Sequence, residues 1–505
     1  MPVSFPRPRW RRAALLASVS LLASCTVGPD FERPAPPETK GYTEEGLPPM
    51  HVEGAKEKEQ RLLLGQDIPG EWWHLFRSER LNDVLKQAVA GNQNIIAATA
   101  TLAQARQGIA QAAGALYPQV DVQAGVSREK LSNAVFGVPG QLQAFNLYSI
   151  GPTVSYALDP FGGNRRRVEQ QEALTDFSDF QLDAAYLTLT GNAVIQAINI
   201  ASARAQIAAY NTIIADDERN LNLVRTELQA GEATQIDVQL AQSQLENDRT
   251  ALPPLRQQLS VARHALSILV GRLPAEWVPP DFDLTEFTLP EELPVTLPSA
   301  LVRRRPDILA SEAQLHAASA AIGVATAQLY PNINLTASFT SEANHVGDLF
   351  AGPAYAIGAQ LLAPIFHGGA LTAQKQATVE AFNAALANYR QTVLTGFGQV
   401  ADSLQALQHD LEEVEAQRRA LESSETNLKL TQTTYSFGNV GILQVLDAQR
   451  LAEQARVGFV RAQAQRYLDT AQLFTALGGG WWEWRAAPAQ AKGEGAALTP
   501  VAAKQ

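Results

Sequence analysis

The chain has a single cysteine, Cys25, and the residues around it indicate which chemistry its thiol carries out. Four arginines stand upstream, followed by an apolar run from Ala13 to Ala23 and then by Ser24. A basic segment, a short apolar run and a small residue before the cleavage point are typical of a secretory signal peptide. The run is also well short of the roughly 20 residues that span a bilayer. We therefore expect a signal peptide over 1–24 and a covalent lipid on Cys25; an incidental cysteine or a free thiol is the alternative.

The residues on either side of the cleavage point indicate which membrane would hold that lipid. Leu22 to Cys25 resemble a bacterial lipobox, in which the cysteine becomes the first mature residue and carries the lipid. By resemblance to bacterial lipoproteins, Thr26 in place of an aspartate favours the outer membrane over the inner one. A single cysteine also excludes an intramolecular disulfide, so packing alone must stabilise the fold.

Catalytic and metal-binding motifs are absent from the sequence. It contains no Walker A loop, no G-x-S-x-G and no H-E-x-x-H, and its seven histidines do not have the spacing of metal ligands. "GFGQVA" at 396 fits G-x-G-x-x-A but lies inside a helical stretch with no strand before it. A net charge of -11 argues against nucleic acid as a partner. We expect no enzyme, no metal and no cofactor apart from the lipid on Cys25.

Two long segments without proline predict helices of unusual length. They run from Asn164 to Ala230 and from Ala370 to Phe437, and a helix of that length measures roughly 100 Å. In the second segment, apolar residues recur at alternating spacings of three and four, interrupted only by Arg418 and Glu425. This heptad pattern is typical of helices packed side by side, which explains it without any ligand. The apolar positions are Leu404, Leu407, Leu411, Val414, Leu421 and Leu428.

Four short segments alternate strictly between apolar and small polar residues. The segments have seven to eleven residues, close to the length of a tilted strand that crosses a membrane. A half-buried strand in a soluble sheet would alternate in the same way, but the secretion signal and the aromatic residues at the strand ends favour the membrane. The segments are Val120–Val126, Tyr148–Leu158, Ile333–Thr340 and Tyr355–Leu361.

The chain also repeats itself. "LYPQVDVQAG" at 116 returns as "LYPNINLTAS" at 329, and "AGEATQIDVQLAQ" at 230 returns as "FGNVGILQVLDAQ" at 437. Each copy predicts two strands, a long helix, a glycine turn and a returning helix, which indicates a tandem duplication. The predicted divisions are a signal peptide (1–24), a lipidated N-terminal arm (25–70), a first repeat (71–271), a proline-rich connector (272–303), a second repeat (304–482) and a disordered tail (483–505).

Four membrane strands cannot close a barrel within one chain. Small barrels need about eight strands, and an open edge in lipid leaves backbone groups without partners. Three chains would supply twelve strands, and the same symmetry would gather the long helices into a tube. The predicted fold is therefore a mixed α and β membrane protein. It has a trimeric 12-stranded β-barrel, with four strands per chain, joined to a long α-helical periplasmic barrel.

Six segments of the mature chain, from Cys25 to about Trp482, carry distinctive motifs. They are "CTVGPDFERP", "WWHLF", "YALDPFGGNRR", "RRPDILASEAQLHAASAAIGVATAQLYPNINL", "VLDAQR" and "ALGGGWW". Together these segments resemble the outer-membrane factor family and, more closely, the NodT-type lipoprotein channels of tripartite resistance-nodulation-division efflux pumps. The resemblance implies a homotrimer in the outer membrane of a Gram-negative bacterium. It would dock to a periplasmic adaptor and an inner-membrane pump, and it would passively conduct small molecules such as drugs and toxic compounds out of the cell.

The repeats also indicate where such a channel would narrow. Gly231 and Gly438 turn the chain at the far end of the long helices, where glycine tolerates a positive φ. Leu443 and Asp447 are four residues apart and share a helix face, so three copies would form an apolar ring beside a carboxylate ring. By similarity to the family, these two residues match positions that narrow the periplasmic aperture, and Arg450 matches a position in its polar network. An exposed ion pair between Asp447 and Arg450 is the alternative.

Two other functions fit parts of the sequence. A non-porous coiled-coil structural lipoprotein would use the long helices, although it needs neither alternating strands nor a duplication. A channel of the same fold could serve metal-ion efflux or type I protein secretion. The sequence has no methionine-rich or histidine-rich lining that would mark a cargo.

Overall fold

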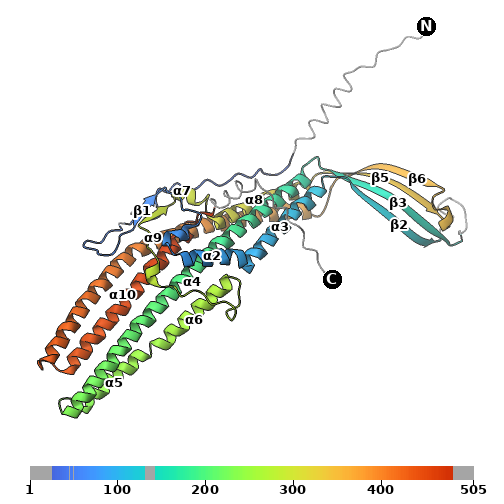
Figure 1. Ribbon diagram of the computed structural model, residues 1–505. Helices are drawn as coiled ribbons and strands as arrows, with labels where there is room; N and C mark the ends of the chain where they lie inside the picture. The colour runs from blue at the N-terminus through green and yellow to red at the C-terminus, as the bar shows by residue number, and fades with distance from the viewer. Residues whose placement is uncertain (1–25, 45, 49, 131–142, 482–505) are drawn as a thin grey trace, which may run out of the picture. The chain divides into compact units, whose positions relative to one another are not determined.

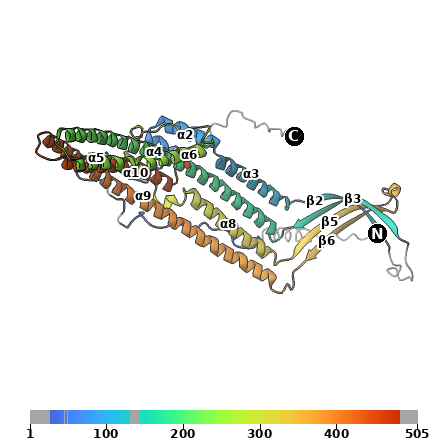
Figure 2. The same ribbon diagram turned by 90° about the horizontal axis from the view of Figure 1, so that it is seen from below.

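The computed structural model describes residues 26–44, 46–48, 50–130 and 143–481. Cys25, the predicted signal peptide over 1–24 and the predicted tail over 483–505 lie outside these residues. The described chain is mainly helical and divides into two compact units (Figures 1 and 2). Of the described residues, unit 1 contains 26–34, 100–130, 143–179 and 310–390, and unit 2 contains those of 35–99, 180–309 and 391–481. Each unit therefore combines segments from both sequence repeats.

Unit 1 contains a four-stranded antiparallel sheet in the order β2-β3-β5-β6 (Figure 1). All four alternating segments are strands, as predicted, and each strand extends beyond the segment that the alternation marks. The loop between β5 and β6 carries a short 3-10 helix, η4 (Val346–Asp348). The strands are β2 (Gln119–Glu129), β3 (Phe145–Leu158), β5 (Asn332–Ala343) and β6 (Pro353–Leu362).

The register of this sheet gathers apolar side chains on one face. Directly paired residues share a face, and the register pairs Val120 with Val154 and Ala337 with Ile357. The opposite face carries small polar residues such as Ser155 and its partner Thr336. The apolar face includes Val120, Val122, Val126, Tyr148, Ile150, Val154, Tyr156, Leu335, Phe339, Tyr355, Ile357 and Leu361.

Residues 26–34, which directly follow Cys25, pack within unit 1. The Val27 amide donates to the carbonyl oxygen of Phe161 over 3.0 Å, next to the end of β3. The buried Arg166 guanidinium donates from Nη2 to the Asp30 carboxylate over 2.6 Å. A Cβ at Gly28 would lie 2.5 Å from Gly323 Cα, so only glycine permits this close approach.

Unit 2 has a core of aromatic and aliphatic side chains. Trp72, Phe76, Phe282 and Phe474 are fully buried in it, and Trp72 packs on Phe474 with ring centroids 5.3 Å apart. Three elements of the core lie within 71–99 and 272–303: η1 (Trp72–Phe76), α2 (Glu79–Gly91) and η3 (Leu284–Glu286). A small parallel pair, β1 (Arg61–Leu64) with β4 (Glu292–Val295), joins the N-terminal arm to the connector. The sequence pattern does not predict this pair, because each strand has only four residues.

The remaining helices follow the predicted pattern of long helix, turn and returning helix. The two long helices α4 and α9 each contribute residues to both units. The described helices contain none that is long and apolar enough to cross a membrane. The helices are α3 (Gln93–Gly114), α4 (Gly163–Ala230), α5 (Gln235–Arg249), α6 (Leu252–Leu269), α7 (Pro298–Leu301), α8 (Pro306–Ala327), α9 (Ala370–Ser436) and α10 (Ile442–Ala476).

The heptad pattern of α9 marks its buried side. Leu404, Leu407, Leu411 and Val414 are fully buried, as the pattern predicts. The two interruptions are ion-paired: Arg418 donates from Nε to Glu415 over 3.0 Å, and Glu425 pairs with Arg456 of α10 at 2.7 Å. Glu425 therefore connects α9 to α10, whereas Arg418 is held by acidic residues of α9 itself.

Candidate functional site

The glycine turns between the long helices have the same backbone structure in both repeats. Gly231 follows α4 with a φ of +83°, and Gly438 follows α9 with a φ of +76°. The Gly231 amide donates to the Leu228 carbonyl oxygen over 3.1 Å, and the next amide reaches back five residues over 2.9 Å. Gly438 donates to the Tyr435 carbonyl oxygen over 2.8 Å, and its next amide also reaches back five residues, over 3.1 Å. Both turns are Schellman motifs, which require a left-handed residue at the glycine position.

The helices that start after these turns are capped differently. Thr234 caps α5 through a capping box: its amide donates to the Asp237 carboxylate over 2.8 Å, and the Asp237 amide donates to Thr234 Oγ1 over 3.3 Å. The side-chain hydrogen bond from Thr234 lowers the pKa of Asp237. Gly441 begins α10 without a side-chain cap. Asp237 is therefore engaged in capping the first turn of α5, whereas Asp447 of α10 takes no part in a helix cap.

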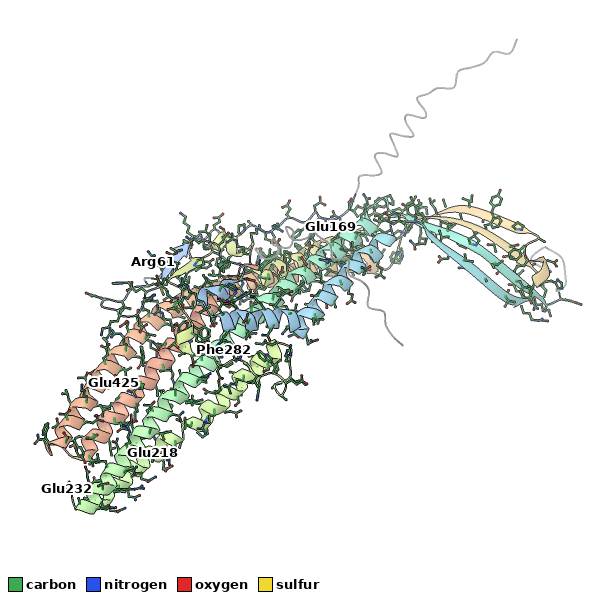
Figure 3. All side chains as sticks on the ribbon, in the orientation of Figure 1. Arg61, Glu169, Glu218, Glu232, Phe282 and Glu425 are labelled. Carbon is green, nitrogen blue, oxygen red and sulfur yellow. The ribbon has the colours of Figure 1, made fainter. Side chains whose placement is uncertain are left out.

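Behind the turns, α10 packs on the hairpin formed by α4 and α5 (Figures 1 and 3). Ile442 and Val445 of α10 are buried against Leu221 and Val224 of α4 and Leu245 of α5. These contacts fix which face of α10 points inward.

The predicted aperture residues lie on the outward face of the first turns of α10. The Leu443 side chain is 51% exposed, and the Asp447 side chain is 63% exposed. Arg450 Nη2 lies 2.8 Å from Asp447 Oδ1, and its Nη1 donates to Gln454 over 3.4 Å. An exposed ion pair of this kind contributes only about 0.3–0.5 kcal/mol. In the single chain, the structure therefore brings Asp447 and Arg450 together and leaves Leu443 free to face another copy.

A buried acidic cluster, which the motifs of the sequence do not predict, lies further from the turns. Asp217 of α4, Asp248 of α5 and Glu453 of α10 each place one carboxylate oxygen within 4.8 Å of the other two. The Nε2 of Gln449 donates to Asp217 over 2.8 Å and to Glu453 over 2.7 Å. Burial, and next the charge of Glu453, raise the pKa of Asp217 to about 8. Burial likewise raises the pKa of Glu453 to about 7.

The spacing of apolar residues along the helices indicates that two of these acids occupy core positions. Asp217 stands between Ile213 and Leu221 at spacings of four, so it occupies a core position of α4. Asp248 follows Leu245 by three residues on the buried side of α5. Acidic residues at core positions of neighbouring helices therefore indicate such a cluster. A search for metal sites by histidine spacing misses it, because the cluster contains no histidine.

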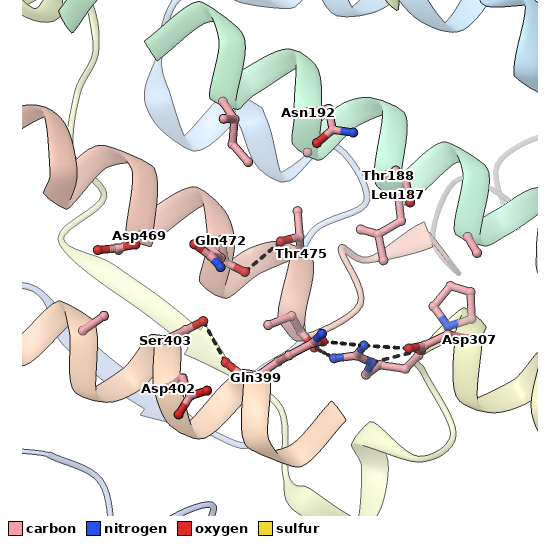
Figure 4. A pocket seen from close by; sticks show the side chains of 17 residues that line it. Leu187, Thr188, Asn192, Asp307, Gln399, Asp402, Ser403, Asp469, Gln472 and Thr475 are labelled. Atoms are coloured by element: carbon pink, nitrogen blue, oxygen red, sulfur yellow. Dashed lines mark hydrogen bonds and ion pairs between the residues drawn. The ribbon is translucent and has the colours of Figure 1, made fainter. Parts of the chain in front are cut away.

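A cavity of about 460 Å³, lined by both polar and apolar side chains, lies within unit 2 between α4, α9 and α10 (Figure 4). Arg305, from the "RRPD" segment, forms part of its wall and donates from Nη2 to Asp307 over 2.7 Å and to Gln399 over 2.8 Å. Its Nη1 donates to the carbonyl oxygen of Ala476 over 2.9 Å. Ser403 in this cavity donates to the carbonyl oxygen of Gln399 over 2.8 Å instead of pairing with a base. The segment therefore joins the start of α8 to α9 and α10, and the lining offers no activated nucleophile.

Residues 84–272 and 297–479 match the family model of the outer membrane efflux protein. The pyoverdine export outer membrane protein OpmQ of Pseudomonas aeruginosa is 32% identical over 420 residues, covering 81% of this chain and 87% of OpmQ. Nodulation protein T of Rhizobium leguminosarum bv. viciae is 29% identical over 469 residues, covering 91% of this chain and 92% of that protein. The probable outer membrane lipoprotein SilC of Salmonella typhimurium is 25% identical over 473 residues, covering 93% of this chain and 98% of SilC.

Solved structures of outer-membrane channels also superpose on this chain. The outer-membrane channel OprN superposes with a TM-score of 0.82 at 25% identity, covering 90% of this chain and all of the OprN chain. The open state of the MtrE outer membrane channel of Neisseria gonorrhoeae superposes with a TM-score of 0.77 at 26% identity, covering 90% of this chain and 99% of the MtrE chain. The fold and the matches together define an efflux channel protein of the outer membrane. The chain belongs to the outer membrane efflux protein family, as the sequence motifs predict.

Proposed function

We propose that this chain forms the exit channel of a tripartite efflux system as a homotrimer. Its twelve strands would close one β-barrel in the outer membrane, and its long helices would form a periplasmic barrel. The observation that carries this proposal is the β2-β3-β5-β6 sheet, which combines one continuous apolar face with two edge strands that have a neighbour on one side only.

The edge strands are the main argument for three copies. Every residue of β6 is exposed, as are nearly all residues of β2, and Val122 and Ile357 on the apolar face are 71% and 82% exposed. Backbone amides and carbonyls at such an edge need partners in lipid, and β2 of one copy can supply them to β6 of the next. Three copies of four strands close a barrel of ordinary size. The two equivalent Schellman turns support the view that each chain is itself a duplication.

The aperture would form where Leu443 and Asp447 of three chains face a common axis. An apolar ring disfavours water, and a carboxylate ring favours cations over anions. Arg450 would hold Asp447 in a polar network through the 2.8 Å contact. Contact with the periplasmic adaptor would favour a second packing of the helix ends and so shift the population toward an open channel.

The partners follow from the same assignment. The trimer would receive small molecules, such as drugs or toxic compounds, from an inner-membrane resistance-nodulation-division pump and a periplasmic adaptor. Energy would come from the pump, since the channel conducts passively. The name of OpmQ specifies pyoverdine export for that relative. No described residue of this chain singles out a cargo.

Cys25 would anchor each chain by its lipid. The name of SilC includes the word lipoprotein, which supports this assignment. Residues 26–34 are held close to the end of β3 by the contacts of Val27 and Arg166. A lipid on Cys25 would therefore sit near the strands, where the proposal places the membrane.

The test is the mass of the detergent-purified protein together with its conductance in a planar bilayer. A particle of three chains that forms stable pores is the expected result. A monodisperse monomer would overturn the trimer. A well-folded trimer without pores, both as the native chain and as Asp447→Ala, would favour the non-porous lipoprotein.

A further inference from the structure

Three helices of unit 2 meet at the acidic cluster formed by Asp217, Asp248 and Glu453. One oxygen from each lies within 4.8 Å of the other two. Ca²⁺ binds carboxylate oxygens at 2.3–2.6 Å, so two oxygens on one ion are at most about 5 Å apart. The spacing of the three oxygens therefore suits a single ion between them.

Basic side chains act on this cluster only through space: the charge of Arg456 opposes the rise in the pKa of Glu453. In the described part of the chain, no ion pair joins any of the three acids to a lysine, arginine or histidine. The arginines on the neighbouring turns are engaged with other acids. Arg219 pairs with Asp216, Arg249 with Glu218 and Glu246, and Arg456 with Glu425.

A buried carboxylate oxygen without an N–H or hydroxyl donor provides a second observation in favour of a ligand. Asp217 is only 2% exposed, and its Oδ2 accepts no hydrogen bond from such a donor. The Asp217 side chain also meets the Asp248 carboxyl, a contact that is a hydrogen bond only while the two acids share a proton. The other oxygen of Asp217, Oδ1, accepts from Gln449, which also donates to Glu453 and so holds these two acids at fixed positions on α4 and α10. An unpartnered buried acceptor is unfavourable, and a bound cation would satisfy it.

We propose that Asp217, Asp248 and Glu453 form a divalent-cation site that fastens α10 to α4 and α5. The donor set consists of carboxylate oxygens, which suit hard cations such as Ca²⁺ and Mg²⁺ better than zinc or copper. Asp248 is only partly buried, so water can complete the coordination sphere from that side. Ca²⁺ fits best, because it accepts irregular geometry and a variable number of ligands.

The site lies about 20 Å along the helices from the two glycine turns. Asp217 precedes Gly231, and Glu453 follows the first turns of α10, which carry Leu443 and Asp447. A cation there would restrict movement of this part of α10 against the α4–α5 hairpin. This effect on the aperture rests on the proposed function. Binding of the cation does not, because the three carboxylates belong to a single chain.

The experiment measures Ca²⁺ binding by calorimetry to the full, detergent-purified protein after treatment with EDTA, at about pH 9, above the pKa of about 8 of Asp217. We expect one Ca²⁺ per chain and a melting temperature that rises with Ca²⁺. Asp217→Asn and Glu453→Gln should each weaken binding by about tenfold or more. Glu218→Gln, which changes the exposed neighbour of Asp217, and Asp447→Asn should bind as the native chain does.

Three results would overturn the proposal. They are an absence of binding to the native chain, undiminished binding to both cluster variants, and a loss of stability at high pH that Ca²⁺ does not restore. The last result would mean that the three carboxyl groups share protons instead of a metal ion. If Asp217→Asn fails to fold, Asp248→Asn at the more exposed corner provides the same test. A protein that binds Ca²⁺ yet forms no pores, both as the native chain and as Asp447→Ala, would refute the proposed channel and leave the cation site standing.

Discussion

Asp410 of α9 and Asp469 of α10 interact directly in the buried interface between these helices. Burial, and next the charge of Asp469, raise the pKa of Asp410 to about 8. Glu413 on α9 acts in the same direction, whereas Arg466 on α10 opposes it. In the folded protein, the pair therefore holds a proton that a free aspartate has lost.

This pair makes the stability of unit 2 depend on pH. Between about pH 4 and pH 8, the folded state binds the proton and the unfolded state does not, so the free energy of unfolding falls as the pH rises. Asp410→Asn keeps the shape and removes the ionisation. We expect this variant to flatten the dependence and to gain on the order of 1 kcal/mol or more at pH 8. Thermal unfolding at several pH values measures it, and identical curves for both proteins would contradict the assignment.

Gly438, in a turn, and Gly398, inside a helix, should respond in opposite directions to replacement by alanine. At Gly438 an added Cβ meets nothing within 4 Å, but the φ of +76° is unfavourable for alanine. Gly438→Ala should therefore lower the free energy of unfolding by about 1–2 kcal/mol. The matched control is Gly398→Ala in α9, where space is also open but the backbone is helical, and it should raise stability by about 0.5–1 kcal/mol. Equal effects at both sites would refute the argument from backbone conformation.

The difference between what the sequence predicts and what it misses follows from how far apart the interacting residues are. Proline-free segments and strict alternation are local, so they locate α4, α9 and the four strands to within a few residues. The β1–β4 pair joins residues more than two hundred positions apart through strands of four residues, too short for any period to appear. Periodicity marks Asp217 and Asp248 as core positions of their own helices, but the cluster with Glu453 arises only when three helices pack together, and no local pattern says which helices meet.

The segment that follows Cys25 should detach when its arginine clamp is removed. Arg166 is buried and donates to Asp30 over 2.6 Å and to Glu169 over 2.7 Å. Arg166→Ala leaves both acids without this partner, and we expect residues 26–34 to become accessible to protease. The control is Arg167→Ala, an exposed neighbour. Proteolysis at the same rate in both variants would show that the clamp does not hold the segment.

Lipid attachment is tested at Cys25 itself. Cys25→Ser should abolish incorporation of a labelled fatty acid while the protein still assembles, because the contacts of residues 26–34 within unit 1 do not involve the lipid. Labelling that persists in the variant would rule out Cys25 as the anchor. The oligomeric mass of the variant in detergent separates loss of the lipid from loss of the fold.

The last prediction concerns the proposed aperture. Asp447→Ala removes the carboxylate and breaks its 2.8 Å contact with Arg450, while the buried face of α10, with Ile442 and Val445, stays intact. We expect a higher single-channel conductance and weaker cation selectivity in a planar bilayer, because the ring loses both its charge and its polar network. Glu232→Gln, at the exposed turn after α4, removes a charge from the same end of the helices and should leave conductance unchanged (Figure 3). An effect of equal size in both variants would mean that surface charge, and not a ring formed by Asp447, controls the current.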